Sequence, residues 1–309
     1  MSEKQPLLKR IWYYKWIYLL LLPGLIHLLI FAYGPMYGLQ LAFRSFSHAA
    51  GIWGSDWVGM DNFHFMVNHP LFFRSVRNTL TLSIMHLVFG FPAPIILAIL
   101  INELRSRKLS RVLQTIFTFP HFLSWIVLAG ISFQLFASAG LVNSVVQLVF
   151  PEWSNSVLRS GTHYRWFLVL SGIWQGAGWS SIIYLAAIAG IDPSLYESAT
   201  MDGANRWHRI RHITWPGMQM TAMMLFILAM GGIMGGNFDQ IFNTINALTN
   251  SHGEIVSVFL MQQFQGLAPN YGFLTAVGLF NGLINAVFLI TANMVVKKVK
   301  GQALFSLGS

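Results

Sequence analysis

The side chains that could do chemistry in this 309-residue chain are ten histidines and ten acidic residues, and their spacing favours no active site. His208 and His212 have the i, i+4 spacing of a metal-binding pair, but the arginines beside them disfavour a cation and no glutamate base lies between them. His27, His86 and His121 lie in apolar stretches without an Asp or Glu to share a proton relay. We therefore predict no catalytic residue, no metal site and no cofactor in this chain.

Energy from ATP would have to come from another chain, because no G-x-x-x-x-G-K-[ST] phosphate-binding loop occurs. Cysteine is absent, which excludes disulfides, thiolate nucleophiles and cysteine-bound metals. Charged residues make up 9% and hydrophobic residues 55%, whereas a soluble domain has about 25% charged residues. The net charge of +9 does not gather on one soluble domain, as it would for nucleic-acid binding. Composition thus predicts a membrane protein that binds no nucleic acid.

The segment 191–217 carries the clearest helix signals outside the apolar stretches. Asp192 is suited to cap a helix N-terminus, Pro193 suits the first helical position, and Gly203 suits the residue after the last turn. A short helix over Leu195–Asp202 is therefore predicted.

A second helix is predicted after Asn205, because Trp207, Ile210 and Ile213 share one helix face until Pro216 is expected to end it. The two helices form a helix-turn-helix, with the acidic Glu197 in the first helix and the basic Arg206 and Arg209 in the second. Such a projection could dock into a groove on a cytoplasmic partner.

Membrane helices must position these residues, since six stretches are long and apolar enough to cross a bilayer. About 20 residues, each rising about 1.5 Å, span the hydrocarbon layer with every backbone group hydrogen-bonded inside the helix. The six predicted spans are Trp16–Tyr33, Thr79–Ile101, Val112–Phe136, Trp166–Gly190, Met218–Gly236 and Phe273–Val296. A seventh apolar stretch, Leu141–Phe150, is too short to span.

Basic residues predict the orientation of the bundle, because cytoplasmic loops carry the excess of Lys and Arg. Fourteen of the nineteen basic residues fall in the two tails and in the connections after spans two and four. The remaining five fall in the connections after spans one and three. Both termini and the segment 191–217 are therefore predicted to be cytoplasmic.

Helix breakers occur inside the predicted spans: Pro92 and Pro94 in the second, Pro120 in the third, and a glycine-rich stretch, 231–236, at the end of the fifth. Freed backbone groups at membrane depth are tolerated only against protein or water, which indicates either a lined cavity or kinks between packed helices. The glycines also have the small-xxx-small spacing that lets another helix approach closely.

The segment 191–217 resembles the EAA loop of bacterial binding-protein-dependent ABC importer permeases. The pattern of that loop is E-A-A, three residues, G, nine residues, I, one residue, L-P. The residues here keep every spacing and are Glu197-Ser198-Ala199, Gly203, Ile213 and Trp215-Pro216. Ser198 replaces an alanine and remains small, and Trp215 replaces a leucine and remains apolar.

Other stretches resemble the carbohydrate-importing branch of this family, which includes the maltose-type permeases and a subgroup for complex polysaccharides such as alginate. They are Tyr33-Gly34-Pro35-Met36-Tyr37-Gly38, Trp57-Val58-Gly59-Met60-Asp61-Asn62-Phe63, Asn78-Thr79 and Phe238-Asp239-Gln240-Ile241-Phe242. The resemblance implies an all-α membrane protein with the type I ABC importer permease fold, six transmembrane helices and a cytoplasmic coupling helix between the fourth and fifth. The implied divisions are an N-terminal tail (1–15), a first helix (16–33), an outer loop (34–74), a permease core (75–296) and a C-terminal tail (297–309).

The resemblance also implies a function and partners. The chain would be a permease subunit for oligo- or polysaccharide uptake in the bacterial cytoplasmic (inner) membrane, pairing with a second, related permease chain. A separate dimeric ABC ATPase would bind ATP and Mg, and an extracytoplasmic solute-binding protein would deliver the sugar. The implied ATPase-coupling residues are Glu197, Ser198, Ala199, Asp202, Gly203, Ala204, Ile213 and Pro216.

Candidate residues of the substrate path are amides, a carboxylate and tryptophans, because these groups bind sugar hydroxyls and stack on sugar rings. They are Trp174, Gln175, Trp179, Asn237, Asp239, Gln240, Asn281 and Asn285. Interhelical hydrogen bonds, interface tryptophans and helix caps are the alternative roles. The alternative function, an ion-coupled secondary transporter, would show inverted repeats and buried ionisable residues, and the sequence shows neither.

Overall fold

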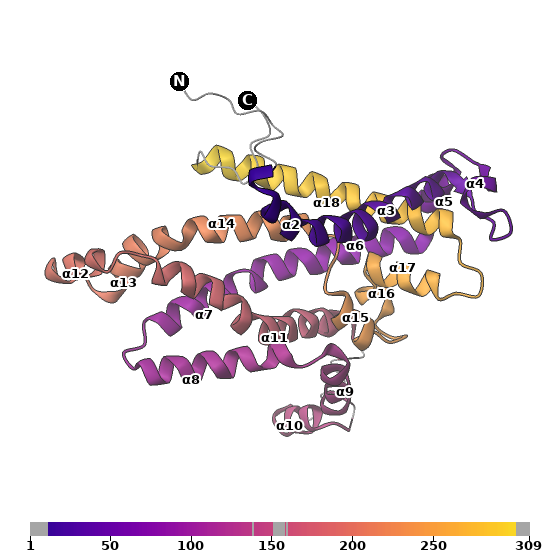
Figure 1. Ribbon diagram of the computed structural model, residues 1–309. Coiled ribbons are helices and arrows are strands. Elements are labelled where there is room, and N and C mark those ends of the chain that lie inside the picture. Colours follow the sequence, from indigo (N-terminus) through magenta and orange to yellow (C-terminus); the bar gives the residue numbers. More distant parts are fainter. Residues whose placement is uncertain (1–11, 138, 151–157, 159, 301–309) are drawn as a thin grey trace. The chain divides into compact units, whose positions relative to one another are not determined.

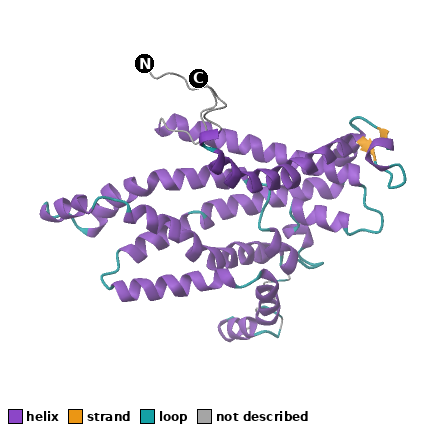
Figure 2. Cartoon of the chain, in the orientation of Figure 1, coloured by secondary structure: helices purple, strands orange, loops and turns teal. Residues whose placement is uncertain are grey.

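The computed structural model describes residues 12–137, 139–150, 158 and 160–300. It is built of helices, and the described residues contain one small sheet of two strands (Figures 1 and 2). Most of the two predicted tails therefore lies outside the described residues. The described residues form two compact units, one within the ranges 12–68 and 267–279 and one within the ranges 69–266 and 280–300.

The smaller unit begins with a long helical stretch and continues into the two strands. Its elements are α2 (Lys15–Leu28), the π-helical turn η1 (Leu29–Tyr33), α3 (Gly34–Met36), the 3₁₀ stretch η2 (Tyr37–Phe43), β1 (Arg44–Ser45), α4 (Gly51–Gly54), β2 (Asp56–Trp57), α5 (Asp61–Asn68) and the first turns of α18 (Tyr271–Lys300). The strands pair antiparallel, with Arg44 opposite Trp57. The Asn62 amide donates to the carbonyls of Ala42 and Arg44, at 3.0 Å each, and so holds β1 against α5.

The larger unit contains the remaining helices and the rest of α18. They are α6 (Pro70–Met85), η3 (His86–Gly90), α7 (Pro92–Asn102), α8 (Arg107–Thr118), η4 (Phe119–Phe122), α9 (Trp125–Leu135), α10 (Leu141–Val149), α11 (Gly161–Ala189), α12 (Pro193–Met201), α13 (Arg206–Arg209), η5 (Ile210–Thr214), α14 (Trp215–Gly231), α15 (Phe238–Thr244), α16 (Asn250–Gly253) and α17 (Val256–Phe264).

Helix α11 is the centre of the larger unit and contacts α7, α8 and α14 (Figure 1). One apolar cluster, with Tyr164 and Ile255, surrounds its first turns, and another, with Ile95, Tyr184 and Met218, surrounds its last turns. Lipid tails are as apolar as these side chains, so the clusters stabilise the unit through close van der Waals packing more than through removal from water.

Three prolines each follow a π-helical turn. Pro35, Pro92 and Pro216 stand in the first turns of α3, α7 and α14, directly after η1, η3 and η5. Proline lacks an N–H and its ring clashes with the carbonyl four residues earlier, and the extra residue of a π turn relieves both problems without ending the helix.

Two predicted helix ends are corrected by these turns. The first helical stretch continues past Tyr33 to Phe43. Pro216 does not end the second helix of the segment 191–217, because α13 runs through η5 into α14.

Pro120 has a different effect, because it lies in η4 between α8 and α9, whose axes differ by 94°. The predicted third span is therefore a bent pair. The predicted fifth span ends earlier than expected: α14 ends at Gly231 and a turn follows, with Gly236 at a φ of +58°.

Among the described residues, four helical stretches are long and apolar enough to cross a membrane, or five if the bent pair counts as one span. The four are Lys15–Phe43, Pro70–Asn102, Arg206–Gly231 and Tyr271–Lys298. Helix α11, the predicted fourth span, has 29 residues but is not in this set. Helix α10 covers the apolar stretch predicted to be too short, and it has 9 residues.

Candidate coupling loop and substrate path

Helix α12 begins at the capping residues that the sequence predicts. The Asp192 carboxylate accepts a hydrogen bond from the backbone N–H of Ser194 at 2.9 Å. Pro193 occupies the first turn, where a backbone N–H would form no hydrogen bond within the helix, so its absence costs nothing. The backbone and side-chain hydrogen bonds from Ser194 lower the pKa of Asp192, because they favour the ionised carboxylate.

Helix α12 ends in a Schellman motif. Gly203 has a φ of +76°, its N–H donates to the carbonyl of Thr200 at 3.1 Å, and the N–H of Ala204 donates to the carbonyl of Ala199 at 2.9 Å. No atom lies within 4 Å of the place that a Cβ of Gly203 would occupy. The need for glycine here is therefore conformational and not a matter of space.

The surface of this loop combines an acid with large apolar side chains. Glu197 is exposed, and so are Leu195, Trp207 and Met201, with Met201 exposed to 89%. Large exposed apolar side chains thus occur on both α12 and α13. Leu195 and Met201 lie outside the motif, so no sequence pattern assigns them a role. Of the other motif residues, Ser198, Asp202, Gly203 and Pro216 are exposed, and Ala199, Ala204 and Ile213 are half-buried.

Two side-chain contacts fasten α12 to the helix that continues into α14. The hydroxyls of Tyr196 and Thr214 lie 2.9 Å apart, and the Arg209 guanidinium donates to the Thr200 hydroxyl at 3.2 Å. Asn205 caps α13 by accepting from the N–H of His208 at 2.9 Å. The contact between Tyr196 and Thr214 could not be predicted, because no local sequence pattern marks a hydrogen bond across a turn.

A cavity of about 490 Å³ lies inside the larger unit, between α6, η3 and α7 on one side and α11, α14 and α15 on the other. Its polar lining includes Ser83, His86, Asn237 and Gln240 among mostly apolar side chains. Of the candidate path residues, Asn237 and Gln240 therefore share one site. The sequence left open whether the helix breakers line a cavity or kink packed helices. Three of them, Pro94, Gly232 and Gly236, line this cavity.

Gln240 is buried, and its amide donates to the carbonyl of Leu168 at 2.8 Å and to the hydroxyl of Ser171 at 2.9 Å. It thus joins α15 to α11. Asn285 likewise accepts from the backbone N–H of Met234 at 2.9 Å and ties the turn after α14 to α18. These amides have the helix-joining role that the sequence offered as the alternative.

The other candidate path residues are not brought together at this cavity. The Trp179 ring stacks on that of His121 with centroids 4.8 Å apart, and Gln175 donates to the carbonyl of His121 at 3.4 Å. The remaining three differ in exposure: Trp174 and Asp239 are exposed, and Asn281 has a buried Oδ1 without a hydrogen-bond partner in the described part of the chain.

Comparison with known proteins identifies the family, since residues 74–301 match the family described as the binding-protein-dependent transport system inner membrane component. This chain belongs to that family. Its members are permease subunits of ABC transporters, and the helical type I ABC importer permease fold accounts for the bundle described above. The family assignment gives no support to the alternative of an ion-coupled transporter.

Curated relatives and solved structures resemble this permease over almost its whole length. Protein LplB of Bacillus subtilis (strain 168) is 40% identical over 94% of this chain and 91% of its own. The polygalacturonan/rhamnogalacturonan transport system permease protein YteP of the same organism is 36% identical over 98% of this chain and 94% of its own. A bacterial alginate ABC transporter, solved in complex with an alginate pentasaccharide-bound periplasmic protein, contains a chain that is 34% identical, with a TM-score of 0.87 over 97% of this chain and 100% of that chain.

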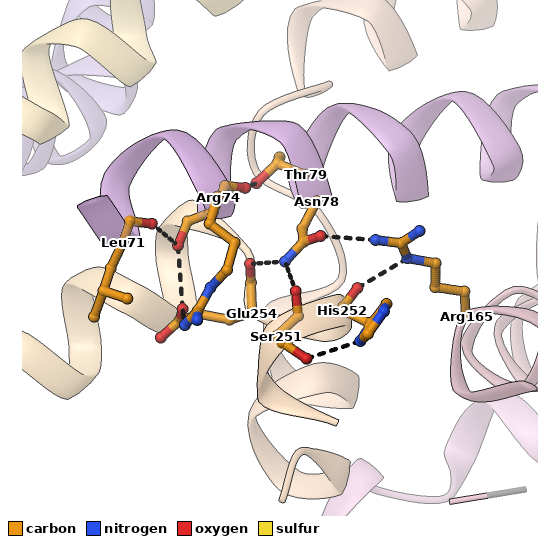
Figure 3. Close-up of polar contacts among 9 residues, drawn as sticks. Leu71, Arg74, Asn78, Thr79, Arg165, Ser251, His252 and Glu254 are labelled. Atoms are coloured by element: carbon orange, nitrogen blue, oxygen red, sulfur yellow. Dashed lines mark hydrogen bonds and ion pairs between the residues drawn. The ribbon is translucent and has the colours of Figure 1, made fainter. Parts of the chain in front are cut away.

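The permease also contains a buried polar cluster that the sequence analysis did not predict (Figure 3). Glu254 is 1% exposed and pairs with Arg74 of α6 at 2.6 Å. The Asn78 amide donates to the carbonyls of Ser251 and Glu254, and Arg165 of α11 donates to Asn78 Oδ1 at 2.8 Å. The cluster holds the segment around α16 against α6 and α11.

Proposed function

We propose that this permease imports an oligo- or polysaccharide and forms half of the translocation path, with a second, related permease chain forming the other half. The support comes from the similarity to YteP and to the alginate transporter chain, at 36% and 34% identity over almost the whole length. Because that transporter binds a saccharide-loaded periplasmic protein, we propose that an extracytoplasmic binding protein delivers the substrate here as well.

The observation that carries the proposed mechanism is an exposed loop fastened to a membrane helix. The loop presents Glu197 and Met201 outward, and the contact between Tyr196 and Thr214 ties it to η5 and α14. A separate dimeric ABC ATPase would bind ATP and Mg, dock on this loop and move it as a rigid body when it closes. Movement of α12 would then pass to α14 and switch the bundle between two states.

The proposed architecture has six transmembrane helices in the bacterial inner membrane, with both termini and the coupling helix α12 on the cytoplasmic side. Helix α11 would be the fourth span, supported by its length of 29 residues, and the bent pair α8 and α9 would be the third. We propose the divisions that the sequence predicts. They are an N-terminal tail (1–15), a first helix (16–33), an outer loop (34–74), a permease core (75–296) and a C-terminal tail (297–309).

Within the substrate path, Asn237 has the strongest support, because it is exposed and lines the cavity. Gln240 would position the cavity wall, and Trp174 offers an exposed ring for stacking on a sugar. We keep the other five candidates in the same proposed path: Gln175, Trp179, Asp239, Asn281 and Asn285.

Charge reversal on the loop tests the coupling role. We expect Glu197→Lys and Gly203→Asp to abolish uptake of a labelled oligosaccharide in cells, while immunodetection still finds the protein in the membrane. The matched control is Asp56→Lys, which reverses an exposed acid of β2, outside the loop, and should leave uptake unchanged. Normal uptake by the Gly203→Asp variant would remove the assignment, and co-purification should recover an ATPase and a second permease with the wild-type chain.

A further inference from the structure

A second cavity, of about 510 Å³, adjoins α12, and two of its lining residues, Tyr196 and Arg209, also fasten that helix. Its lining residues come from the turn after α7, the last turn of α11, α12 and α13. They are Asn102, Glu103, Arg105, Ile188, Tyr196, Arg206 and Arg209. We refer to this cavity as the arginine cleft.

The arginine cleft has an excess of positive charge. Three guanidinium groups face one carboxylate, that of Glu103, and the ion pair found among the described residues is Arg74 with Glu254, far from this cleft in sequence. Glu103 therefore forms no ion pair with the arginines. The Nε of Arg209 is buried and has no hydrogen-bond partner in the described part of the chain, although another nitrogen of the same group binds Thr200.

The cleft lies next to the ends of two apolar helices. Asn102 ends the membrane-length stretch Pro70–Asn102, and Ile188 lies one residue before the end of α11. Where an apolar helix ends, the hydrocarbon layer gives way to lipid headgroups and water. Basic pockets between helices at this depth suit anionic headgroups.

We propose that the arginine cleft binds a phosphate group, either the headgroup phosphate of an anionic lipid or a free phosphate ion. Guanidinium groups bind phosphate through two parallel charged hydrogen bonds, and three of them line this cleft. A bound phosphate would bridge the turn after α7 and α13, and so steady the base of the coupling loop. The site needs neither a sugar nor an ATPase, and it stands or falls independently of the proposed transport function.

The test uses the full-length chain in lipid nanodiscs and compares two matched double variants. Arg105→Gln with Arg206→Gln removes two charges of the cleft, and Arg107→Gln with Arg111→Gln removes two charges from α8, which does not line it. Phosphatidylglycerol is titrated into phosphatidylcholine nanodiscs and inorganic phosphate into the buffer at constant ionic strength. Binding is read by native mass spectrometry and by the shift of the unfolding temperature.

We expect the wild type and the α8 variant to bind one of the two probes. The cleft variant should bind it about a hundredfold more weakly, because each of its two lost charged hydrogen bonds is worth at least about tenfold. Protection by phosphatidylglycerol alone identifies a lipid site, and protection by inorganic phosphate in any lipid identifies a soluble ligand. Equal binding by the cleft and α8 variants overturns the proposal. Arg105→Gln alone, on an exposed turn, is the second variant if the double variant fails to fold, and it should weaken binding in the same direction.

Discussion

Gly203 controls the shape of the coupling loop through one backbone angle. Its φ of +76° costs a residue with a Cβ about 1–2 kcal/mol, while the space around it is open. We expect Gly203→Ala and, more severely, Gly203→Val to raise the number of ATP molecules hydrolysed per substrate transported by the assembled transporter in proteoliposomes. Gly203→Asn should retain more coupling, because Asn adopts this conformation more readily.

The matched control for this series is Gly130→Ala in α9, where the glycine has no positive φ and a Cβ would also meet no atom within 4 Å. It should couple normally. If Gly203→Val transported as efficiently as the wild type, the Schellman motif would have no role in coupling.

The ion pair between Arg74 and Glu254 is expected to stabilise the fold strongly. Glu254→Gln would leave the arginine without its counter-charge, which costs about 3–5 kcal/mol for a fully buried pair. The Arg74 side chain is 30% exposed, so water should reduce this cost. Thermal unfolding in detergent should show a lower midpoint for Glu254→Gln than for Asp239→Asn, which alters an exposed acid.

A double-mutant cycle isolates the pair. The combined variant Arg74→Gln and Glu254→Gln should lose less stability than the two single losses together, because each single change already breaks the contact. Strictly additive losses would mean that the two side chains contribute independently.

At the scale of elements, the contact between Tyr196 and Thr214 is one of two side-chain links from α12 to the helix that continues into α14. Tyr196→Phe removes the hydroxyl and keeps the ring, so we expect the transporter to assemble but to stimulate ATP hydrolysis less when the loaded binding protein is added. The measurement is the ratio of stimulated to basal ATPase activity in proteoliposomes.

Tyr18→Phe, an exposed position of α2, is the matched control for this variant. Its stimulation ratio should equal that of the wild type. Full stimulation in Tyr196→Phe would show that another contact, such as that of Arg209 with Thr200, carries the movement.

The contact of α8 with α11 depends on the absence of a side chain at Gly178. A Cβ there would overlap the backbone carbonyl of Phe117, and neither helix can yield as a flexible side chain would. Gly178→Ala should therefore destabilise the fold by about 1–3 kcal/mol or more, as overpacking does. Gly176→Ala, two residues away with open space, should be neutral or stabilising, and the two midpoints of thermal unfolding should differ accordingly.

The sequence predicts the elements of the coupling loop well, because their signals are local. Asp192, Pro193 and Gly203 act through neighbours within a few residues, and the structure places them in the predicted cap and turn. The end at Pro216 was wrong because η5 widens the helix before it, and no residue type in Ile210–Thr214 marks a π turn. The partners of Glu254 could not be predicted, since they lie far away in the sequence.

At the scale of the whole molecule, the orientation in the membrane can be tested directly, because the chain has no cysteine. The native Met201 side chain, in the coupling loop, is 89% exposed, and that of Leu267 is fully exposed. A cysteine at either position should therefore be accessible to a reagent. We expect a membrane-impermeant maleimide to label Leu267→Cys in intact spheroplasts and Met201→Cys only after the membrane is opened. Labelling of Met201→Cys from outside would contradict the proposed topology.

Hydropathy and charge predict that this is a membrane protein and predict most of its spans. The reason is that bilayer thickness requires apolar stretches of about 20 residues, which can be recognised in a sequence. Helix α11 has the length of a span but is not among the helices that are apolar enough to cross a membrane, so its place as the fourth span stays a prediction. The cavity between α6, α11 and α14 could not be predicted at all, because its size depends on how the helices pack.

The π turn η5 sets the rotation of the coupling loop about the axis of α14. Each residue advances an α-helix by about 100° around its axis, so one residue more or fewer between the loop and α14 would rotate everything beyond that point by about that angle. The number of residues in Ile210–Thr214 therefore fixes the direction, around the helix axis, in which the loop meets its neighbour. This holds whatever side chains the turn carries.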